Sequence, residues 1–457
     1  MKTCSSHIIA ILLLILSGCS SGEKNSPDEP TVDTPESNNV YFEFNKWTYS
    51  QMNRQYLWRE DMPDSLDCDY ELAPREFFKS LLSKKDRFSY FTVNSSRSRG
   101  DEGQGYGFAY QIYRDKAGVE AMQVLYISAD EVLQAGIRRG DILRLINSNN
   151  NSATFRVVMV ENNHFVETEQ VITYSLPDLG VNKDTVLLDS VYEIETHKIG
   201  YLCYLEYDDP KDLMPSIESF SEAGITDLIL DLRYNPGGYV STCKFLCNCI
   251  VPPDGYEQIF QQCSYNDILS EYYREKTGES RTYNYYDVPS DVLGNLRGYH
   301  IINLGLERLL VLTSKGTASA SEATVVCLRP YMPVILIGET TVGKGVGSWT
   351  ISDPKYYYAL QPITMRYYNA NGETTPDEGL EVDYPVSGGY STVRSEIGNI
   401  NEPLLQKALS VITGITIPRS QTFNYDAPEG LEAVGEPSFV TEFQSRFRGD
   451  GVETMRE

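Results

Sequence analysis

The stretch VLTSKGTASASEATVVCLRPYMPVILIGETTVGKGVGSW, residues 311–349, decides the fold of this chain. It opens inside an apolar run, Leu309 to Thr313, which predicts a strand. A turn of small residues separates this strand from a helix predicted over Ala318 to Cys327. Val334 to Ile337 predicts the next strand, and a glycine loop follows it. Strand, helix and strand in this order are typical of an α/β domain with parallel strand pairs.

Two side chains at the ends of this unit can carry chemistry. Ser319 follows the small-residue turn, where the unpaired N–H groups of a helix N-terminus offer donors to an anion. Lys344 lies in the loop between Gly343 and Gly345. A desolvated lysine can be neutral near neutral pH and can then serve as the base for a serine hydroxyl. The local pattern leaves open whether the two side chains meet.

Two other motif matches fail on their context. Gly338 to Lys344 matches the first seven positions of a P-loop, but Gly345 stands where a Ser or Thr would bind Mg²⁺, and a strand is predicted where the P-loop needs a helix. Three short patterns of penicillin-binding enzymes also occur in order, but they are crowded into residues 241–278. We therefore predict no nucleotide site and no penicillin-binding chemistry.

The N-terminus has the features of an export signal. Lys2 precedes an apolar run, Ile8 to Leu16, that is too short to span a bilayer. The run ends in Leu-Ser-Gly-Cys, which resembles the bacterial lipoprotein box. This predicts a signal peptide over residues 1–18, a lipid-modified Cys19 with a flexible tether over 19–40, and a place in the cell envelope, on the periplasmic face of the outer membrane or on the cell surface.

Composition excludes several classes of partner and site. The chain has 39 Lys and Arg against 64 Asp and Glu, which argues against binding to nucleic acid or anionic lipid. The cysteines of the folded part are odd in number and scattered, so they do not resemble a disulfide framework. The few histidines lie beside no plausible nucleophile, which disfavours a Ser-His-Asp site and a histidine metal site. We therefore predict no metal and no cofactor.

A β-rich segment precedes the α/β pattern. Its loop Gly105-Tyr106-Gly107-Phe108, followed by strands and by Ala135 to Leu143, resembles a PDZ domain. In such domains the C-terminal end of a peptide adds as a strand, and N–H groups of the loop hold its carboxylate. A plain β-rich spacer is the alternative interpretation. Further on, residues 255–300 predict an excursion over the surface, and residues 357–365 predict one strand.

A buried strand is also predicted to end in Asp231 to Gly238, DLRYNPGG, where two glycines let the backbone approach a ligand. With Asp86 to Tyr90, the PDZ-like segment, Ser319 to Glu322 and Gly338 to Gly345, this motif forms an ordered set over most of residues 80–385. The set resembles the carboxyl-terminal processing peptidases, also called tail-specific proteases. These are serine peptidases with a Ser/Lys dyad.

The resemblance implies roles for individual residues. The nucleophile falls on Ser319, with Ser321 as the alternative, and the lysine base falls on Lys344. The oxyanion donors fall on the backbone N–H of Ala320 and of a glycine in the pair Gly237-Gly238.

Two further positions lie close to the implied dyad. Many members have a glutamine four positions after the lysine, and Ser348 stands there in this chain. Ser348 is therefore a possible support for the lysine. Glu322 lies in the first helical turn, where a carboxylate favours the helix dipole, so we expect a structural role for it.

Together these observations predict a multidomain α/β protein. The predicted parts are a helical region over 41–100, a PDZ-like domain over 101–185, an α/β peptidase domain over 186–415 and an acidic tail over 416–457. The expected function is a lipid-anchored serine endopeptidase that captures polypeptides by apolar C-terminal ends. The alternatives are a catalytically inactive peptide-binding lipoprotein of the same fold, and cleavage at internal sites with the PDZ-like domain as a gate.

Overall fold

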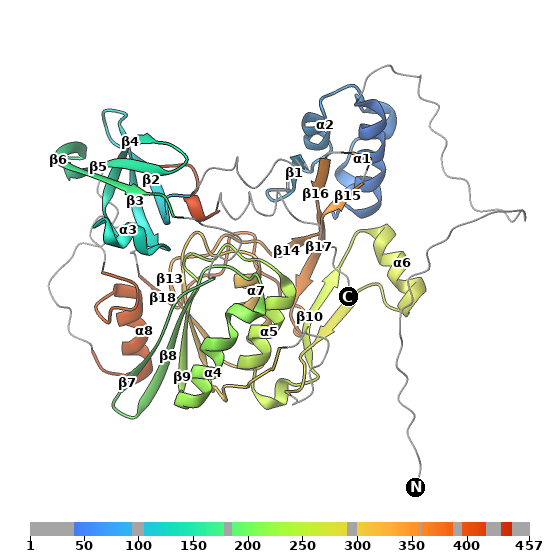
Figure 1. Cartoon of the computed structure of the whole chain (residues 1–457). Coiled ribbons are helices and arrows are strands. Elements are labelled where there is room, and N and C mark those ends of the chain that lie inside the picture. The colour runs from blue at the N-terminus through green and yellow to red at the C-terminus, as the bar shows by residue number, and fades with distance from the viewer. Residues whose placement is uncertain are drawn as a thin grey trace, which may run out of the picture.

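The computed structural model describes residues 41–93, 105–177, 185–289, 299–353, 355–356, 358–386, 395–416 and 431–440. Cys19, the predicted signal peptide and the tether lie outside these ranges, so they stay predictions. Within the ranges, no helix has both the length and the apolar character that crossing a bilayer requires. Figure 1 shows a central sheet with helices, a β-rich domain above one side of it and a helical region above the other.

The central sheet has six strands in the order β18-β13-β12-β9-β8-β7. All neighbouring pairs are parallel except β7 with β8, as the α/β pattern predicts. The strands and their connecting helices are β7 (Val186–Ile194), β8 (His197–Tyr204), α4 (Met214–Ala223), β9 (Asp227–Asp231), α5 (Val240–Ile250), β12 (Leu309–Thr313), α7 (Ala320–Leu328), β13 (Val334–Gly338), β18 (Tyr384–Pro385) and α8 (Pro403–Thr413).

Both faces of this sheet are buried, which explains why its strands read as continuous apolar runs. Alternate residues of β12 point to opposite faces: Leu309 and Val311 pack with α4, α5 and α7, whereas Leu310 and Leu312 pack with α8. The layers are therefore helices, sheet and helix, as Figure 1 shows. Cysteines 243, 247 and 249 are buried in the first of these cores, as predicted, and are free.

A second sheet has the order β11-β10-β17-β14. The prediction that residues 255–300 form a surface excursion is wrong for β10, which is largely buried and pairs with β17. The single strand predicted over 357–365 is also wrong, because Pro362 separates two strands. The elements are β10 (Ile259–Ser264), α6 (Asp267–Thr277), β11 (Thr282–Tyr285), β14 (Val346–Ser348), β16 (Tyr358–Gln361) and β17 (Ile363–Tyr368).

The N-terminal helical region packs on a small sheet of order β1-β16-β15. Because β16 and β15 come from the chain after Lys344, this region lies directly beside the predicted lysine loop. Its elements are α1 (Phe42–Gln55), α2 (Pro74–Ser80), β1 (Tyr90–Val93) and β15 (Ile351–Ser352). Short 3-10 turns occupy η1 (Arg59–Asp61), η2 (Ser65–Asp67), η3 (Pro210–Asp212) and η4 (Pro253–Gly255).

The β-rich domain is one antiparallel sheet of order β19-β2-β3-β4-β5-β6. Its strand β19 comes from the predicted acidic tail, so these residues of the tail are part of the β-rich domain. The elements are β2 (Phe108–Arg114), β3 (Glu120–Ile127), α3 (Asp130–Gln134), β4 (Ile142–Ser148), β5 (Ser152–Glu161), β6 (His164–Ser175) and β19 (Glu432–Val434).

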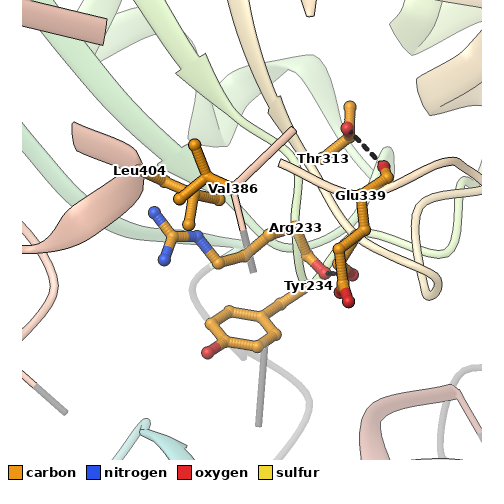
Figure 2. Close-up of a pocket in the computed structure, with 7 residues that line it drawn as sticks. Arg233, Tyr234, Thr313, Glu339, Val386 and Leu404 are labelled. Carbon is orange, nitrogen blue, oxygen red and sulfur yellow. Dashed lines mark hydrogen bonds between the residues drawn. The ribbon is translucent and has the colours of Figure 1, made fainter. Parts of the chain in front are cut away.

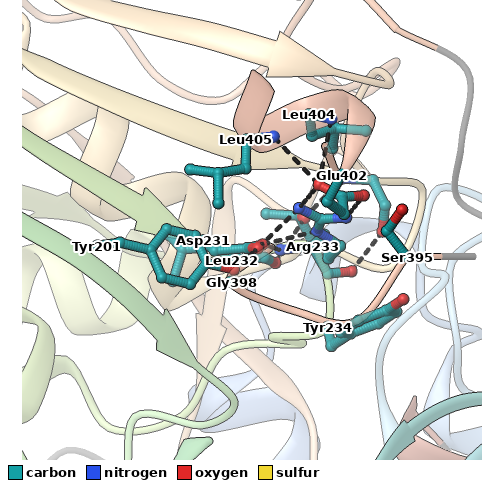
Figure 3. Close-up of polar contacts among 12 residues, drawn as sticks. Tyr201, Asp231, Leu232, Arg233, Tyr234, Ser395, Gly398, Glu402, Leu404 and Leu405 are labelled. Atoms are coloured by element: carbon teal, nitrogen blue, oxygen red, sulfur yellow. Dashed lines mark hydrogen bonds and ion pairs between the residues drawn. The ribbon is translucent and has the colours of Figure 1, made fainter. Parts of the chain in front are cut away.

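A buried ion cluster joins the two domains (Figure 3). The guanidinium of Arg233, just after β9, donates to Asp231 at 2.9 Å and to both carboxylate oxygens of Glu402 at 2.5 and 2.9 Å. Arg139 of the β-rich domain donates to the hydroxyl of Tyr234 at 2.9 Å and lies 3.9 Å from Glu402. These contacts hold the turn after β9 between the sheet, α8 and the β-rich domain.

Replacing Glu402 with Gln should destabilise the protein by about 3 to 5 kcal/mol, because it leaves Arg233 buried without its carboxylate.

Arg233 and Arg139 lower the pKa of Glu402 to about 2 despite its burial. The stabilisation from this lowered pKa is complete above the ordinary glutamate pKa and is lost as pH falls from about 4.3 toward 2. Urea unfolding measures both effects, with the exposed Glu396→Gln as control. Equal stability of the two variants would contradict the assignment.

Candidate active site

Three turns meet at the carboxyl ends of β9, β12 and β13, where ligands bind in open α/β sheets. The carbonyl of Asn235, in the turn after β9, accepts from the N–H of Ala318 at 3.3 Å and the hydroxyl of Ser321 at 3.0 Å, both after β12. The N–H of Val342, after β13, donates to the carbonyl of Thr317 at 3.0 Å. The three motifs that the sequence placed far apart therefore form one cluster.

Ser319 lies in this cluster with an unusual backbone conformation. It caps α7 with φ 58° and ψ −114°, a conformation that is costly for a residue with a side chain. Its side chain is half-buried, whereas Ser321 is fully buried and donates to Asn235. A strained strand-to-helix turn that exposes a serine hydroxyl is typical of a nucleophile. The geometry thus favours Ser319 over Ser321.

A buried carboxylate connects Ser319 to the lysine loop. One oxygen of Glu322 accepts from the backbone N–H of Ser319 and from that of Lys344, each at 2.8 Å. Its other oxygen accepts from the N–H of Gly343 at 2.7 Å and from the hydroxyl of Thr341 at 2.5 Å. The sequence predicted only a favourable interaction of Glu322 with the helix dipole. Because all four bonds lie within the two turns, Glu322 also holds Ser319 and the loop of Lys344 together.

The surroundings of Lys344 favour a neutral amine. Burial lowers its pKa, while the charges of Glu322 and Asp86 oppose this shift. The ring of Phe88 covers the amine, with Nζ 5.5 Å from the ring centroid. Arg87 then donates to the carbonyls of Gly343 at 3.0 Å and Asp377 at 2.8 Å. The N-terminal motif therefore lies against the lysine loop and helps to exclude water from it.

The prediction left open which glycine of the pair Gly237-Gly238 would donate to an oxyanion. Gly237 touches Ser319, since a Cβ on it would lie 2.8 Å from the Cβ of Ser319, but its N–H donates to the side chain of Asn235 at 2.9 Å. For the N–H of Gly238, no hydrogen bond is found among the described residues. Ala320 is the first residue of α7, where N–H groups have no partner within the helix. Ala320 and Gly238 are thus the better donors, and Gly237 provides close approach.

Ser348 is not isolated in the structure. It lies on β14, and its hydroxyl accepts from the side-chain amide of Gln361 at 3.2 Å, while Gln361 accepts from Thr350 at 2.6 Å. Gln361 is buried and lies on β16, beside β1. A glutamine amide therefore reaches the neighbourhood of the predicted support position from another strand.

The PDZ-like loop is well ordered. Gly107 has φ 77°, and a Cβ there would lie 2.8 Å from Pro177 and 2.9 Å from Ala129, so only glycine fits. The carbonyls of Tyr106 and Gly107 accept from the hydroxyl of Tyr174 at 2.6 Å and the N–H of Ser128 at 2.9 Å. Gly105 precedes this pair, and Phe108 begins β2 in the domain core.

A pocket near the ion cluster is separate from the predicted site residues (Figure 2). It lies between the turns after β9 and β12 and α8, with Leu404 and Val386 among its lining residues. Its enclosed volume of about 10 Å³ accommodates roughly one water molecule, which is too small for a substrate. None of the predicted site residues lines it.

Sequence reasoning missed several contributors. Asn235 and Gln361 were not singled out, and Phe88 was noted only as part of a motif. The role of Glu322 had the clearest signal in the sequence, because Glu322 is the one charged residue in the apolar helix Ala320–Leu328, and every residue of this helix is buried. Gln361 offered none, since its contact with Ser348 depends on strand pairing.

Two family models match the chain across these elements. Residues 198–386 match peptidase family S41, and residues 43–90 match the peptidase S41 N-terminal domain, together just over half of the 457 residues. The chain belongs to peptidase family S41. Ser319, Glu322 and Lys344 all lie inside the first match, and the resemblance seen in the sequence is confirmed.

Proteins with similar sequences are named as carboxy-terminal processing proteases or as serine proteases. The chain is 27% identical over 210 residues to the carboxy-terminal processing protease CtpA of Bacillus subtilis, covering 45% of this chain and 38% of CtpA. It is 20% identical over 352 residues to the "Probable CtpA-like serine protease" of Staphylococcus epidermidis, covering 75% of this chain and 65% of that protein. The chain therefore spans less than two thirds of either relative.

The fold is shared with a solved structure. An S41-type protein of Bacteroides fragilis superimposes with a TM-score of 0.66 at 24% identity, covering 81% of this chain and 98% of that one. The multidomain α/β fold class is thereby confirmed.

Replacing Glu322 with Gln should slow labelling of Ser319 by a fluorophosphonate about 100-fold, because an amide turns donor hydrogens toward N–H groups and lets the two turns shift. The labelling rate is measured by intact-protein mass spectrometry. Glu378→Gln, at an exposed position near the lysine loop, is the control. If the Glu322 variant is labelled as fast as the unmodified protein, the carboxylate is not needed to position Ser319.

Proposed function

We propose that this S41 member is a serine endopeptidase with a Ser319/Lys344 dyad, acting on polypeptides that it captures by their C-terminal ends. The observation that carries the proposal is the single Glu322 oxygen bonded to the N–H groups of both dyad residues. A strained serine, a half-buried lysine of lowered pKa and backbone N–H groups without a partner among the described residues are the parts that such a dyad needs.

In the proposed acylation, the hydroxyl oxygen of Ser319 attacks the carbonyl carbon of the scissile bond while neutral Lys344 takes the hydroxyl proton. The N–H groups of Ala320 and Gly238 stabilise the oxyanion, by roughly 3 kcal/mol each. Collapse breaks the C–N bond, and the lysine gives its proton to the leaving amine. A water molecule, deprotonated by the same lysine, then hydrolyses the ester and regenerates Ser319.

Capture is proposed for the PDZ-like domain. A peptide would add to β2 as a strand, and the loop Gly105–Phe108 would hold its terminal carboxylate, with apolar end residues preferred. Attachment through a lipid on Cys19 would keep the enzyme at the cell envelope. Neither step requires a metal, a cofactor or a nucleotide.

Ser319→Ala and Lys344→Ala should each lower kcat/KM for a peptide with a free C-terminus at least 10³-fold, because each removes a group that acts in the chemical step. Hydrolysis is followed by mass spectrometry, and Ser352→Ala, at an exposed position, is the serine control. Full hydrolysis by either dyad variant would refute the assignment. A protein that binds the peptide but neither cleaves it nor labels with a fluorophosphonate would instead be the inactive binding lipoprotein.

The activity should fall as pH falls through the pKa of Lys344, because only the neutral amine can accept the proton. Burial lowers the pKa of Lys344, so the acidic limb of the pH–activity profile should lie below the ordinary lysine pKa. Asp86 opposes the shift, so Asp86→Asn should move the limb to still lower pH, whereas Asp67→Asn, at an exposed position, should not. Profiles of kcat/KM measure the limb. If the acidic limb does not move in the Asp86 variant, the charge of Asp86 does not influence the titration of Lys344.

A further inference from the structure

The outer edge of β2 is occupied by the chain itself. Strand β19 pairs antiparallel with β2, with Glu432 opposite Arg114 and Val434 opposite Ile112. The direction of β19 is informative: as it runs toward its C-terminal end, it runs toward the start of β2 and the loop Gly105–Phe108. A captured C-terminal tail would use the same edge in the same direction.

Side chains extend this pairing along β2. The buried amide of Gln111 donates to the carbonyls of Val434 at 3.2 Å and Gly435 at 3.3 Å. The N–H of Tyr110 donates to the hydroxyl of Ser438 at 2.9 Å. From Tyr110 to Arg114, the hydrogen-bonding edge is therefore covered by residues 432–438, and a second strand could not pair there at the same time.

The segment ends in an anchor against the candidate active site. Gly435, with φ 67°, redirects the chain, and Phe439 is buried with 4% of its surface exposed. Its ring centroid lies 5.6 Å from that of Tyr234, in the turn after β9. Its ring also fills the space beside Gly316, in the turn that leads to Ser319, where a Cβ would lie 2.5 Å from it. Phe439 thus touches two of the three turns of the site.

We propose that residues 432–440 are an intramolecular ligand of the β2 edge, which a captured substrate tail must displace. The contact is small: it consists of three residue pairs, the side-chain bonds of Gln111 and Ser438, and the aromatic anchor. Glu432 and Ala433 are exposed, so the segment can open locally from its β19 end without global unfolding. Displacement also withdraws Phe439 from the turns around Ser319. The inference rests on the proposed capture by β2, and it adds that capture competes with the chain's own segment.

The test measures binding in the full chain carrying Ser319→Ala, so that the outcome does not depend on catalysis. The probe is a fluorescein-labelled decapeptide ending in Ala-Val with a free carboxylate, followed by fluorescence anisotropy. Adding Ser438→Ala and Phe439→Ala should lower its Kd at least fivefold, because the competing ligand is weakened. Glu436→Ala, an exposed change in the same segment, should leave the Kd unchanged. Unchanged or weaker binding by the double variant overturns the inference.

A second measurement needs no change in the segment. Hydrogen exchange of amides 432–440, in the chain with Ser319→Ala alone, should accelerate when the decapeptide is added at saturation. Binding without faster exchange shows that the segment stays in place and overturns the inference, while leaving capture elsewhere intact. Failure of the decapeptide to bind any of these variants overturns the proposed capture and, with it, the competition.

Discussion

The buried carboxylate of Glu322 is the contact on which the site depends. It lies at the start of α7, and its two oxygens accept four hydrogen bonds from the nucleophile turn and the lysine loop. Burial alone raises the pKa of this carboxyl, and the four donors oppose that rise by favouring the ionised form. The same negative charge opposes the lowering of the Lys344 pKa, so the group that positions the base also limits how far its pKa falls.

The surrounding domains support this arrangement from three sides. The cluster of Asp231, Arg233 and Glu402 holds the turn that carries Gly237 and Gly238, and Arg139 connects it to the β-rich domain. The N-terminal region covers the lysine with Phe88. The C-terminal segment reaches the same turns through Phe439. Each domain thus contacts a turn of the site.

Much of this was predictable from local pattern. The apolar runs of β9, β12 and β13 and the helix that follows Ser319 were predicted within a few residues, because burial on both faces leaves a clear signal. The errors fell where long-range pairing decides the structure. Strand β10 is polar in sequence, with two glutamines, yet buried between β11 and β17. Strand β19 is exposed and short, and only its partner β2 makes it a strand.

The sequence by itself determined the family, the α/β order of its elements and the residue types of the dyad, because these depend on neighbours within one turn or one strand. Only the tertiary structure decided that Glu322 joins Ser319 to Lys344 and that Gln361 reaches Ser348. The physical reason is that a hydrogen bond depends on where two segments meet in space. Lys344 and Gln361 lie 22 and 13 positions from the partners they bond, beyond what a local pattern records.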